Sequence, residues 1–397
     1  MNRAPLTIKD DNAIPEILWR MEKWVDCKLK GGGYGIYLTD KYICISGKKT
    51  KIRLFEPDVL KFVANIPPPP NTFGDATPDA IGVAVSNASD MVLALYADRQ
   101  LIVWDTQNPK TKTIAPLFSL PSHTSAITNI AYYSNENNDD ILLQQQQPNG
   151  FSSDVLLSCS LDGSVRIWDL SETTDKSKGN CIACFDPGPK KSGITSMDIV
   201  PGDLLATGDE SGGLYVTDLR TLKNTSSVNG DESAVRQVTH AFVGQVRQSG
   251  TEFKGKRRIV TSMENGKAKV YQVSGEGALE LVQEIENSVA LIGSMFVENG
   301  TRLVSCSEDG KLSIFSATRK EIKLQIEGAA DCKLTDIDLH PNGRYAIACG
   351  VDRCLHIFDL KTATETKSYP AHPKKKVNVR YANVDPSALF VAVCCAD

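Results

Sequence analysis

Short apolar runs that alternate with polar positions recur along the chain, and tight polar turns separate them. In the clearest segment, Leu156 to Asp169, one apolar run ends in an Asp-Gly turn and a second run follows at once. Strict alternation is typical of half-buried β-strands, and helical periodicity appears nowhere at length. The pattern around this segment predicts four successive strands, the innermost first: 126–133, 154–160, 165–168 and 181–185.

The layout of this segment repeats, with an aromatic residue six positions after an acidic turn residue. The clear copies are Asp98 with Trp104, Asp162 with Trp168, Asp309 with Phe315 and Asp352 with Phe358. The degenerate copies are Lys49 with Phe55, Ser211 with Thr217 and Asn265 with Tyr271. Successive signature positions are 43 to 64 residues apart. Such a period, with four short strands per unit, predicts an all-β propeller of seven or eight four-stranded blades.

The dipeptides at the signature positions carry a family resemblance: they are Trp104-Asp105, Trp168-Asp169 and Phe358-Asp359. With these dipeptides the chain resembles the WD-repeat (WD40) propellers. The resemblance covers essentially the whole chain. Blades of that family hold a hydrogen-bonded tetrad, which His123, Ser160, Asp162 and Trp168 match by position. The resemblance implies that the tetrad is structural, because a buried aspartate must be paired. A catalytic triad of His123, Asp162 and Ser160 is the disfavoured alternative.

Several strings outside the blade pattern narrow the resemblance. They are Glu22-Lys-Trp-Val-Asp, Lys51-Ile-Arg-Leu-Phe-Glu-Pro, Phe62-Val-Ala-Asn-Ile-Pro-Pro-Pro-Pro, Leu205-Ala-Thr-Gly-Asp and Phe390-Val-Ala-Val-Cys-Cys-Ala-Asp. In them the chain looks like the second propeller of the MAP-kinase (JNK)-binding WD-repeat scaffolds, a family that includes a microcephaly-associated spindle-pole paralogue. Members are non-catalytic and carry two propellers in tandem. The resemblance implies a protein-interaction scaffold in the cytoplasm, at the centrosome, spindle pole or ciliary cytoskeleton, with kinase-pathway, centrosomal or microtubule-associated partners in a large complex.

Charge and composition exclude several other classes. The balance of 44 Lys+Arg against 48 Asp+Glu gives a net charge of −4, which argues against an obligatory polyanion such as nucleic acid. The longest apolar run, Ala388 to Ala396, is about half of what a membrane span needs, and residues 1–20 show no signal peptide. We therefore expect a soluble chain that needs no membrane.

Candidate metal and catalytic residues are sparse in the sequence. The 11 cysteines mostly lie in strand-like runs, which is typical of free thiols in a reducing compartment. The only Cys-x-x-Cys, at Cys181 and Cys184, has no second pair of ligands nearby, and the five histidines are scattered. The sequence therefore predicts no enzyme, no metal site and no cofactor.

Insertions and basic clusters are the candidate partner-binding segments. The inserted loops are expected at 135–153 and 245–256. The candidate partner-binding residues are Lys254, Lys256, Arg257, Arg258, Lys374, Lys375 and Lys376. Two alternatives to the kinase scaffold stay open: a microtubule-associated or axonemal structural propeller, and a subunit of an RNA-processing complex that would use Lys256, Arg257 and Arg258.

The blade count leaves a remainder, although 1–397 reads as a single propeller. The last turn acid, Asp397, has no aromatic six positions later, so the chain stops between two strands of a blade. One solution is an eighth blade whose outer strands come from residues 1–30, around Trp19 and Trp24, and whose inner strands are 377–382 and 389–395. The other, which the resemblance favours, is that the chain is a fragment of a longer tandem-propeller protein.

Overall fold

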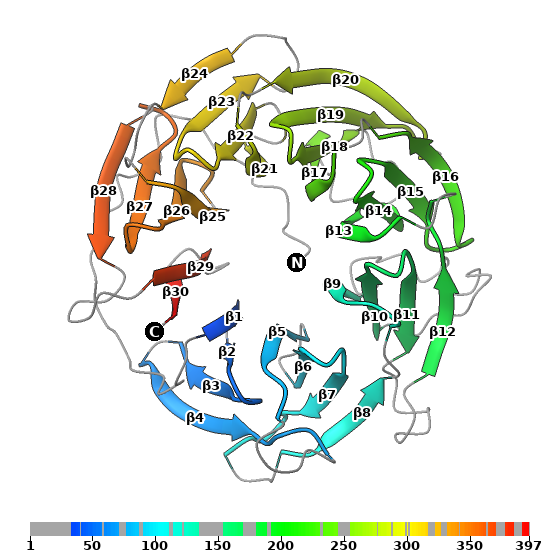
Figure 1. The fold of residues 1–397 in the computed structure, drawn as a ribbon, viewed down its shortest axis with the longest axis vertical. Helices are drawn as coiled ribbons and strands as arrows, with labels where there is room; N and C mark the ends of the chain where they lie inside the picture. The colour runs from blue at the N-terminus through cyan, green and yellow to red at the C-terminus, as the bar shows by residue number, and fades with distance from the viewer. Residues whose placement is uncertain are drawn as a thin grey trace. The chain divides into compact units, whose positions relative to one another are not determined.

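The structure is a computed structural model in which strands are the only regular elements of the described residues (Figure 1). The described residues are 33–39, 41–57, 59–70, 77–86, 90–110, 114–120, 123–134, 154–169, 180–188, 192–230, 233–244, 255–275, 277–286, 289–297, 300, 302–316, 322–326, 332–340, 342–362, 364–370, 378–384 and 391–396. The fold class is the β-propeller that the repeat predicts, with seven four-stranded antiparallel sheets. Within the described ranges, no helix is long and apolar enough to span a membrane.

The chain divides into two compact units, and the first unit contains four complete blades. Their strands are β9 (Ile127–Ser134), β10 (Asp154–Ser160), β11 (Val165–Asp169), β12 (Asn180–Phe185), β13 (Ile194–Val200), β14 (Leu204–Asp209), β15 (Leu214–Asp218), β16 (Lys223–Val228), β17 (Val235–Gly244), β18 (Gly255–Met263), β19 (Lys267–Val273), β20 (Leu279–Glu286), β21 (Leu291–Val297), β22 (Arg302–Ser307), β23 (Leu312–Ser316) and β24 (Ile322–Ile326). The strands of each sheet follow one another in chain order, and each strand pairs with the next one in its sheet.

The second unit contains three complete blades and one two-stranded sheet. Its strands are β1 (Gly33–Leu38), β2 (Ile43–Gly47), β3 (Ile52–Glu56), β4 (Lys61–Ile66), β5 (Ala80–Val85), β6 (Met91–Tyr96), β7 (Leu101–Asp105), β8 (Pro116–Leu120), β25 (Leu334–Leu339), β26 (Tyr345–Gly350), β27 (Cys354–Asp359), β28 (Thr364–Pro370), β29 (Asn378–Val384) and β30 (Val391–Ala396). The β29–β30 sheet contacts β25 on one side and β1 on the other. It therefore occupies a blade position of its own.

Apolar side chains between neighbouring blades form the core of each unit. In the first unit, Val155 and Leu157 of one blade share a cluster with Ile194 and Met197 of the next. In the second unit, Leu54 packs in the same way with residues of the adjacent β5–β8 sheet. Because a neighbouring blade packs against each face of a sheet, the middle strands are buried on both faces, for example β14 and β26. This explains why these strands read as nearly continuous apolar runs.

A repeated irregularity in strand register supports the predicted alignment of the blades. A β-bulge lies between the third and fourth strands at the signature residues Phe55, Trp104, Thr217, Tyr271, Phe315 and Phe358. A second bulge lies near the start of the inner strand, for example between Leu334 and Asp336. The β29–β30 pair has the same bulge, between Val379 and Tyr381. The two-stranded sheet therefore has the register of the inner half of a blade.

The described residues form seven four-stranded sheets and one two-stranded sheet, so the choice between seven and eight blades depends on that last sheet. The predicted closing strands around Trp19 and Trp24 lie outside the described residues. The insertions 135–153 and 245–254 also lie outside them, but they join paired ends, since Ser134 pairs with Asp154 and Gly244 with Gly255. The second insertion is therefore shorter than the predicted 245–256, because Gly255 and Lys256 belong to β18.

Candidate functional site

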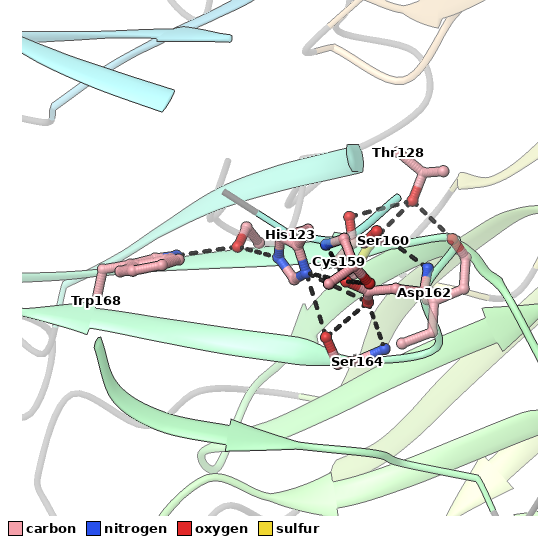
Figure 2. A network of polar contacts seen from close by, with 10 residues as sticks. His123, Thr128, Cys159, Ser160, Asp162, Ser164 and Trp168 are labelled. Carbon is pink, nitrogen blue, oxygen red and sulfur yellow. Dashed lines mark hydrogen bonds and ion pairs between the residues drawn. The ribbon is translucent and has the colours of Figure 1, made fainter. Parts of the chain in front are cut away.

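A polar network of the predicted site residues joins three segments of the β9–β12 blade (Figure 2). His123 precedes β9, Asp162 lies in the turn between β10 and β11, and Trp168 lies on β11. The turn forms because Gly163 adopts a positive φ of 84° and the Ser160 hydroxyl accepts the Asp162 N–H at 3.1 Å. This local geometry directs the Asp162 carboxylate towards the segment before β9.

A chain of hydrogen bonds runs from Asp162 to the indole of Trp168 through a serine. The His123 Nδ1 lies 3.1 Å from an Asp162 oxygen, and its Nε2 lies 2.8 Å from the Ser158 hydroxyl. The Trp168 indole N–H donates to the same hydroxyl at 2.9 Å. All donors and acceptors match if the imidazole N–H sits on Nδ1 and the Ser158 O–H donates to Nε2. The network thus fixes one tautomer of His123.

The serine of the network differs from the sequence prediction, which named Ser160. Ser158 supplies the hydroxyl between His123 and Trp168, whereas Ser160 caps the turn at the Asp162 N–H. Both serines are fully buried, and they lie two residues apart on β10. Strand periodicity places both side chains on one face, so it does not distinguish them.

The Asp162 carboxylate fastens the segment before β9 to the β10–β11 turn. It accepts the Thr124 N–H at 2.9 Å, the Ser164 N–H at 3.0 Å and the Ser164 hydroxyl at 2.6 Å. Burial acts to raise the pKa of Asp162, but these hydrogen bonds and His123 outweigh it and hold the pKa well below its ordinary value. Burial lowers the pKa of His123, so the imidazole is neutral at neutral pH.

The network has the connectivity of a Ser-His-Asp triad, but its serine and histidine are not accessible to a substrate. Ser158 and His123 are 0% and 1% exposed, and the Ser158 oxygen already accepts the Trp168 indole N–H. A nucleophile must reach a substrate carbonyl, which a fully buried hydroxyl does not do. The geometry therefore supports the structural role of this group.

The other predicted signature residues have comparable local roles. Trp104, Phe315 and Phe358 are fully buried in their blades. The acids Asp98, Asp105, Asp352 and Asp359 each accept a backbone N–H from the residue two positions later. Asp309 accepts the Ser307 hydroxyl, and Asp169 is partly buried at the end of β11. These side chains shape turns and the core of their blades.

One acid that the sequence reasoning missed replaces the turn aspartate in the β13–β16 blade. Asp209 accepts the Ser211 and Gly213 N–H groups at 2.9 and 2.7 Å and the Tyr215 hydroxyl at 3.0 Å. The repeat pattern of the sequence pairs Ser211 with Thr217 in this blade. The acid stands two residues earlier than the repeat predicts, but the spacing of six between Asp209 and Tyr215 was a usable signal.

The basic cluster at the start of β18 is largely engaged inside the protein. Arg258 is 5% exposed and donates to the Gly300 carbonyl at 2.8 Å, and Arg257 donates to the Pro201 and Ser274 carbonyls. Burial lowers the pKa of both guanidinium groups. The Arg258 side chain, which the sequence analysis assigns to partner binding, is therefore held inside the protein by the Gly300 carbonyl. Lys256 is exposed, whereas Lys254, Lys374, Lys375 and Lys376 lie outside the described residues.

Replacing Arg258 with alanine should destabilise the protein by about 2 kcal/mol, because it removes a buried charge-assisted hydrogen bond and leaves the Gly300 carbonyl without its donor. Lys256→Ala, two residues away on the exposed part of the strand, should change the free energy of unfolding by less than about 0.5 kcal/mol. Urea titrations of the two variants measure the difference. Equal effects would show that Arg258 has no structural role.

Side chains on one inner strand form hydrogen bonds with the backbone of the inner strand in the neighbouring blade. In the first unit, Thr128 donates to the Ile194 carbonyl at 2.7 Å and Thr239 donates to the Ser294 carbonyl at 2.7 Å. In the second unit, Asp336 accepts the Ala382 N–H at 3.1 Å. Burial, with a contribution from the Asp338 carboxylate, raises the pKa of Asp336 to about 7. A titratable group therefore holds the two-stranded sheet against β25.

The fold and this network define the class of protein. The WD domain, G-beta repeat (WD40) family matches residues 114–169, which contain the whole network, and residues 321–359. The chain thus carries WD40 repeats and resembles the WD-repeat propellers. Among solved structures, the C-terminal WD40 domain of Sif2 aligns with a TM-score of 0.64 and 13% identity, over 93% of this chain and 96% of that chain. The computationally designed Ika8 protein aligns with a TM-score of 0.64 and 15% identity, over 92% of this chain and 94% of that chain.

Curated relatives make the comparison more particular. Mitogen-activated protein kinase-binding protein 1 of Mus musculus is 22% identical over 88% of this chain and 26% of its own length. WD repeat-containing protein 62 of Mus musculus is 20% identical over 95% of this chain and 27% of its length. Striatin-3 of Bos taurus is 23% identical over 70% of this chain and 33% of its length. The chain thus spans about a quarter to a third of the relatives it matches.

Proposed function

We propose that the chain is a non-catalytic platform that brings together proteins of a mitogen-activated protein kinase pathway. The observation that supports this most directly is the alignment of 88% of the chain with mitogen-activated protein kinase-binding protein 1. The buried Ser158-His123-Asp162 group adds to it, because its polar side chains bind one another and offer nothing to a substrate. The relatives named after WD repeats and striatin are consistent with an interaction scaffold.

The proposed docking surface belongs to the first unit. It lies at the end of each blade where the inner strand finishes and the second strand begins. The inner strands β9 and β13 run in the same direction, since Thr128 near the start of one bonds to Ile194 at the start of the other. The same holds for β13 and β17, which Thr195 and Val235 link. The paired ends Ser134–Asp154 of β9–β10 and Gly244–Gly255 of β17–β18 therefore lie on one face, opposite the β10–β11 turn that carries Asp162. Exposed Lys256 lies on this face, at the start of β18.

Binding of the intact chain to purified mitogen-activated protein kinases tests the proposal. We expect saturable binding that Lys256→Glu weakens about fivefold, since charge reversal at an interface rim slows association. Glu264→Lys is the matched control, because Glu264 is exposed just beyond the opposite end of the same strand. It should change the affinity less than about twofold. Equal effects of the two reversals would contradict the assigned face.

Proximity labelling in cells tests the wider proposal, which includes a cytoplasmic, cytoskeleton-associated location. The intact chain should label kinase-pathway and centrosomal proteins, and a chain without 135–153 and 245–254 should lose them. Labelling of the intact chain that contains no kinase-pathway or centrosomal proteins would overturn the kinase-pathway proposal. Tubulin or RNA-processing factors in their place would favour the two alternatives. Of the three residues that the RNA alternative would use, Arg257 and Arg258 bond to backbone carbonyls and Lys256 is exposed.

A further inference from the structure

Three side chains with different metal-binding atoms converge in the second unit. They are Cys332, just before β25, Asp352, in the turn between β26 and β27, and His356, on β27. The Cys332 sulfur, a carboxylate oxygen of Asp352 and a ring nitrogen of His356 all lie within 4.8 Å of one another. The His356 Nε2 is 3.2 and 3.3 Å from the two Asp352 oxygens. Their spacing in the sequence, 20 and 4 residues, matches no common motif.

A glycine leaves the space between the three atoms open. A Cβ atom built on Gly350, the last residue of β26, would lie less than 3.0 Å from the Asp352 oxygen, the Cys332 sulfur and the His356 Nε2. Those three atoms therefore point to one common position. Zinc binds oxygen, nitrogen and sulfur at about 2.0–2.3 Å, so its ligands lie about 3.3–3.8 Å from one another in a tetrahedron. The observed separations need only small side-chain movements to reach that geometry.

The surroundings of His356 orient it as a ligand. Its Nδ1 lies 2.9 Å from a Glu365 oxygen on β28, which makes Nδ1 the donor and leaves the Nε2 lone pair facing Asp352 and Cys332. A carboxylate that accepts the second ring N–H is the usual partner of a zinc-bound histidine. The His356 side chain is 3% exposed, whereas that of Asp352 is 33% exposed. The imidazole is thus held rigidly, and the carboxylate side is open to water.

We propose that Cys332, Asp352 and His356 bind a divalent zinc-class metal ion, with Glu365 orienting His356 and water completing the coordination. A thiolate, an imidazole and a carboxylate form a mixed donor set that suits zinc and cobalt far better than magnesium or calcium. The inference is independent of the proposed kinase-pathway function, because it concerns a different unit from the docking surface. The ion fastens the residues before β25 to the β26–β27 turn, the same connection that Asp162 makes in the β9–β12 blade.

Cobalt titration of the full, reduced and chelator-stripped chain tests the site. We expect one equivalent of Co²⁺ to give the thiolate charge-transfer absorption and the visible bands of a four-coordinate ion, and zinc to displace it. Cys332→Ser should abolish the charge-transfer absorption. Cys184→Ser is the matched control, because Cys184 is exposed on β12 within the only Cys-x-x-Cys of the sequence. It should leave the spectrum unchanged.

Two further variants separate metal binding from folding. Glu365→Gln should weaken zinc binding about tenfold without removing a ligand. Gly350→Ala should block the ion by placing a methyl group between the ligands, and circular dichroism of the metal-free chain checks that the blade still folds. Absence of cobalt absorption in the intact chain would overturn the proposal, because a hydrogen-bonded proton between His356 and Asp352 would then explain the cluster. Retention of the absorption in Cys332→Ser, or its loss in Cys184→Ser, would overturn it equally.

Discussion

Replacing Asp162 with alanine is expected to lower the free energy of unfolding by about 3 kcal/mol at neutral pH. The carboxylate accepts hydrogen bonds from Thr124, Ser164 and His123, and two of those residues precede the inner strand of the blade. Its removal takes away the charged acceptor of the His123 Nδ1–H and leaves the Ser164 hydroxyl, at 3.2 Å, as its remaining partner. The weaker partner adds a desolvation penalty to the lost bonds. Urea unfolding followed by tryptophan fluorescence measures the change, since Trp168 lies at the other end of the network.

Asp98→Ala provides the matched control for this prediction. Asp98 occupies the same turn position in the β5–β8 blade, but it is exposed and accepts the Gln100 N–H at 3.1 Å. Its replacement should cost less than about 1 kcal/mol. The sign of the pH dependence gives a second check: because the folded-state pKa of Asp162 is depressed, its contribution is present above the unfolded-state pKa and is lost as the pH falls through the folded-state value. An Asp162→Ala variant as stable as Asp98→Ala at neutral pH would show that the network is not a stability determinant.

The repeat alone was sufficient to predict the blades, because blade geometry depends on spacing. The signature residues Phe55 and Thr217, which do not match the family dipeptide, still fall on the third strand at the same bulge as Trp104. Strand length and turn position are local properties, and alternation reports them directly. Even the degenerate blades were therefore placed correctly from the sequence.

Side-chain partners were harder to predict than strands. Ser158 and Ser160 share one face of β10, so the strand pattern does not say which serine bonds to Trp168. Trp168 pairs with Leu156 on the neighbouring strand, and its indole N–H extends from there to the Ser158 hydroxyl. In the β13–β16 blade, Asp209 takes over the turn from two residues earlier. In both cases another residue two positions away takes the role that the repeat assigns, and the strand pattern does not change. A positional match to the family therefore does not reveal the residue that forms the contact.

The Cys332 cluster was not predicted for a related reason. Its members come from a segment before a blade, a turn and a third strand, and the blade brings them together only after folding. The only cysteine pair at a short metal-ligand spacing in the sequence is Cys181 and Cys184, which lie elsewhere. The buried position of Arg258 was equally invisible, because a run of basic residues in a sequence looks the same whether it faces solvent or a neighbouring carbonyl.

Asp336→Asn is expected to stabilise the protein at about pH 8 by on the order of 3 kcal/mol, and to change it little near pH 4. The pKa of Asp336 rises from 3.8 to about 7 on folding, mainly because the carboxyl is buried. The folded state therefore keeps a proton that the unfolded state releases as the pH rises from about 4 to about 7, and stability falls across that range. Asparagine removes the charge but keeps an oxygen that accepts the Ala382 N–H.

The second unit is the part of the molecule where this effect should appear, since Asp336 joins β25 to the two-stranded β29–β30 sheet. Hydrogen exchange of the Ala382 amide should therefore slow in the variant at about pH 8, because the sheet opens less often. Asp162→Asn is the control of opposite sign: the depressed pKa of Asp162 means that removing its charge destabilises the protein most at neutral and alkaline pH. If Asp336→Asn and the wild-type chain showed parallel stability curves between about pH 4 and 8, Asp336 would be ionised in the folded state. The β29–β30 sheet would then be held by a charged acceptor, and its attachment would not weaken as the pH rises.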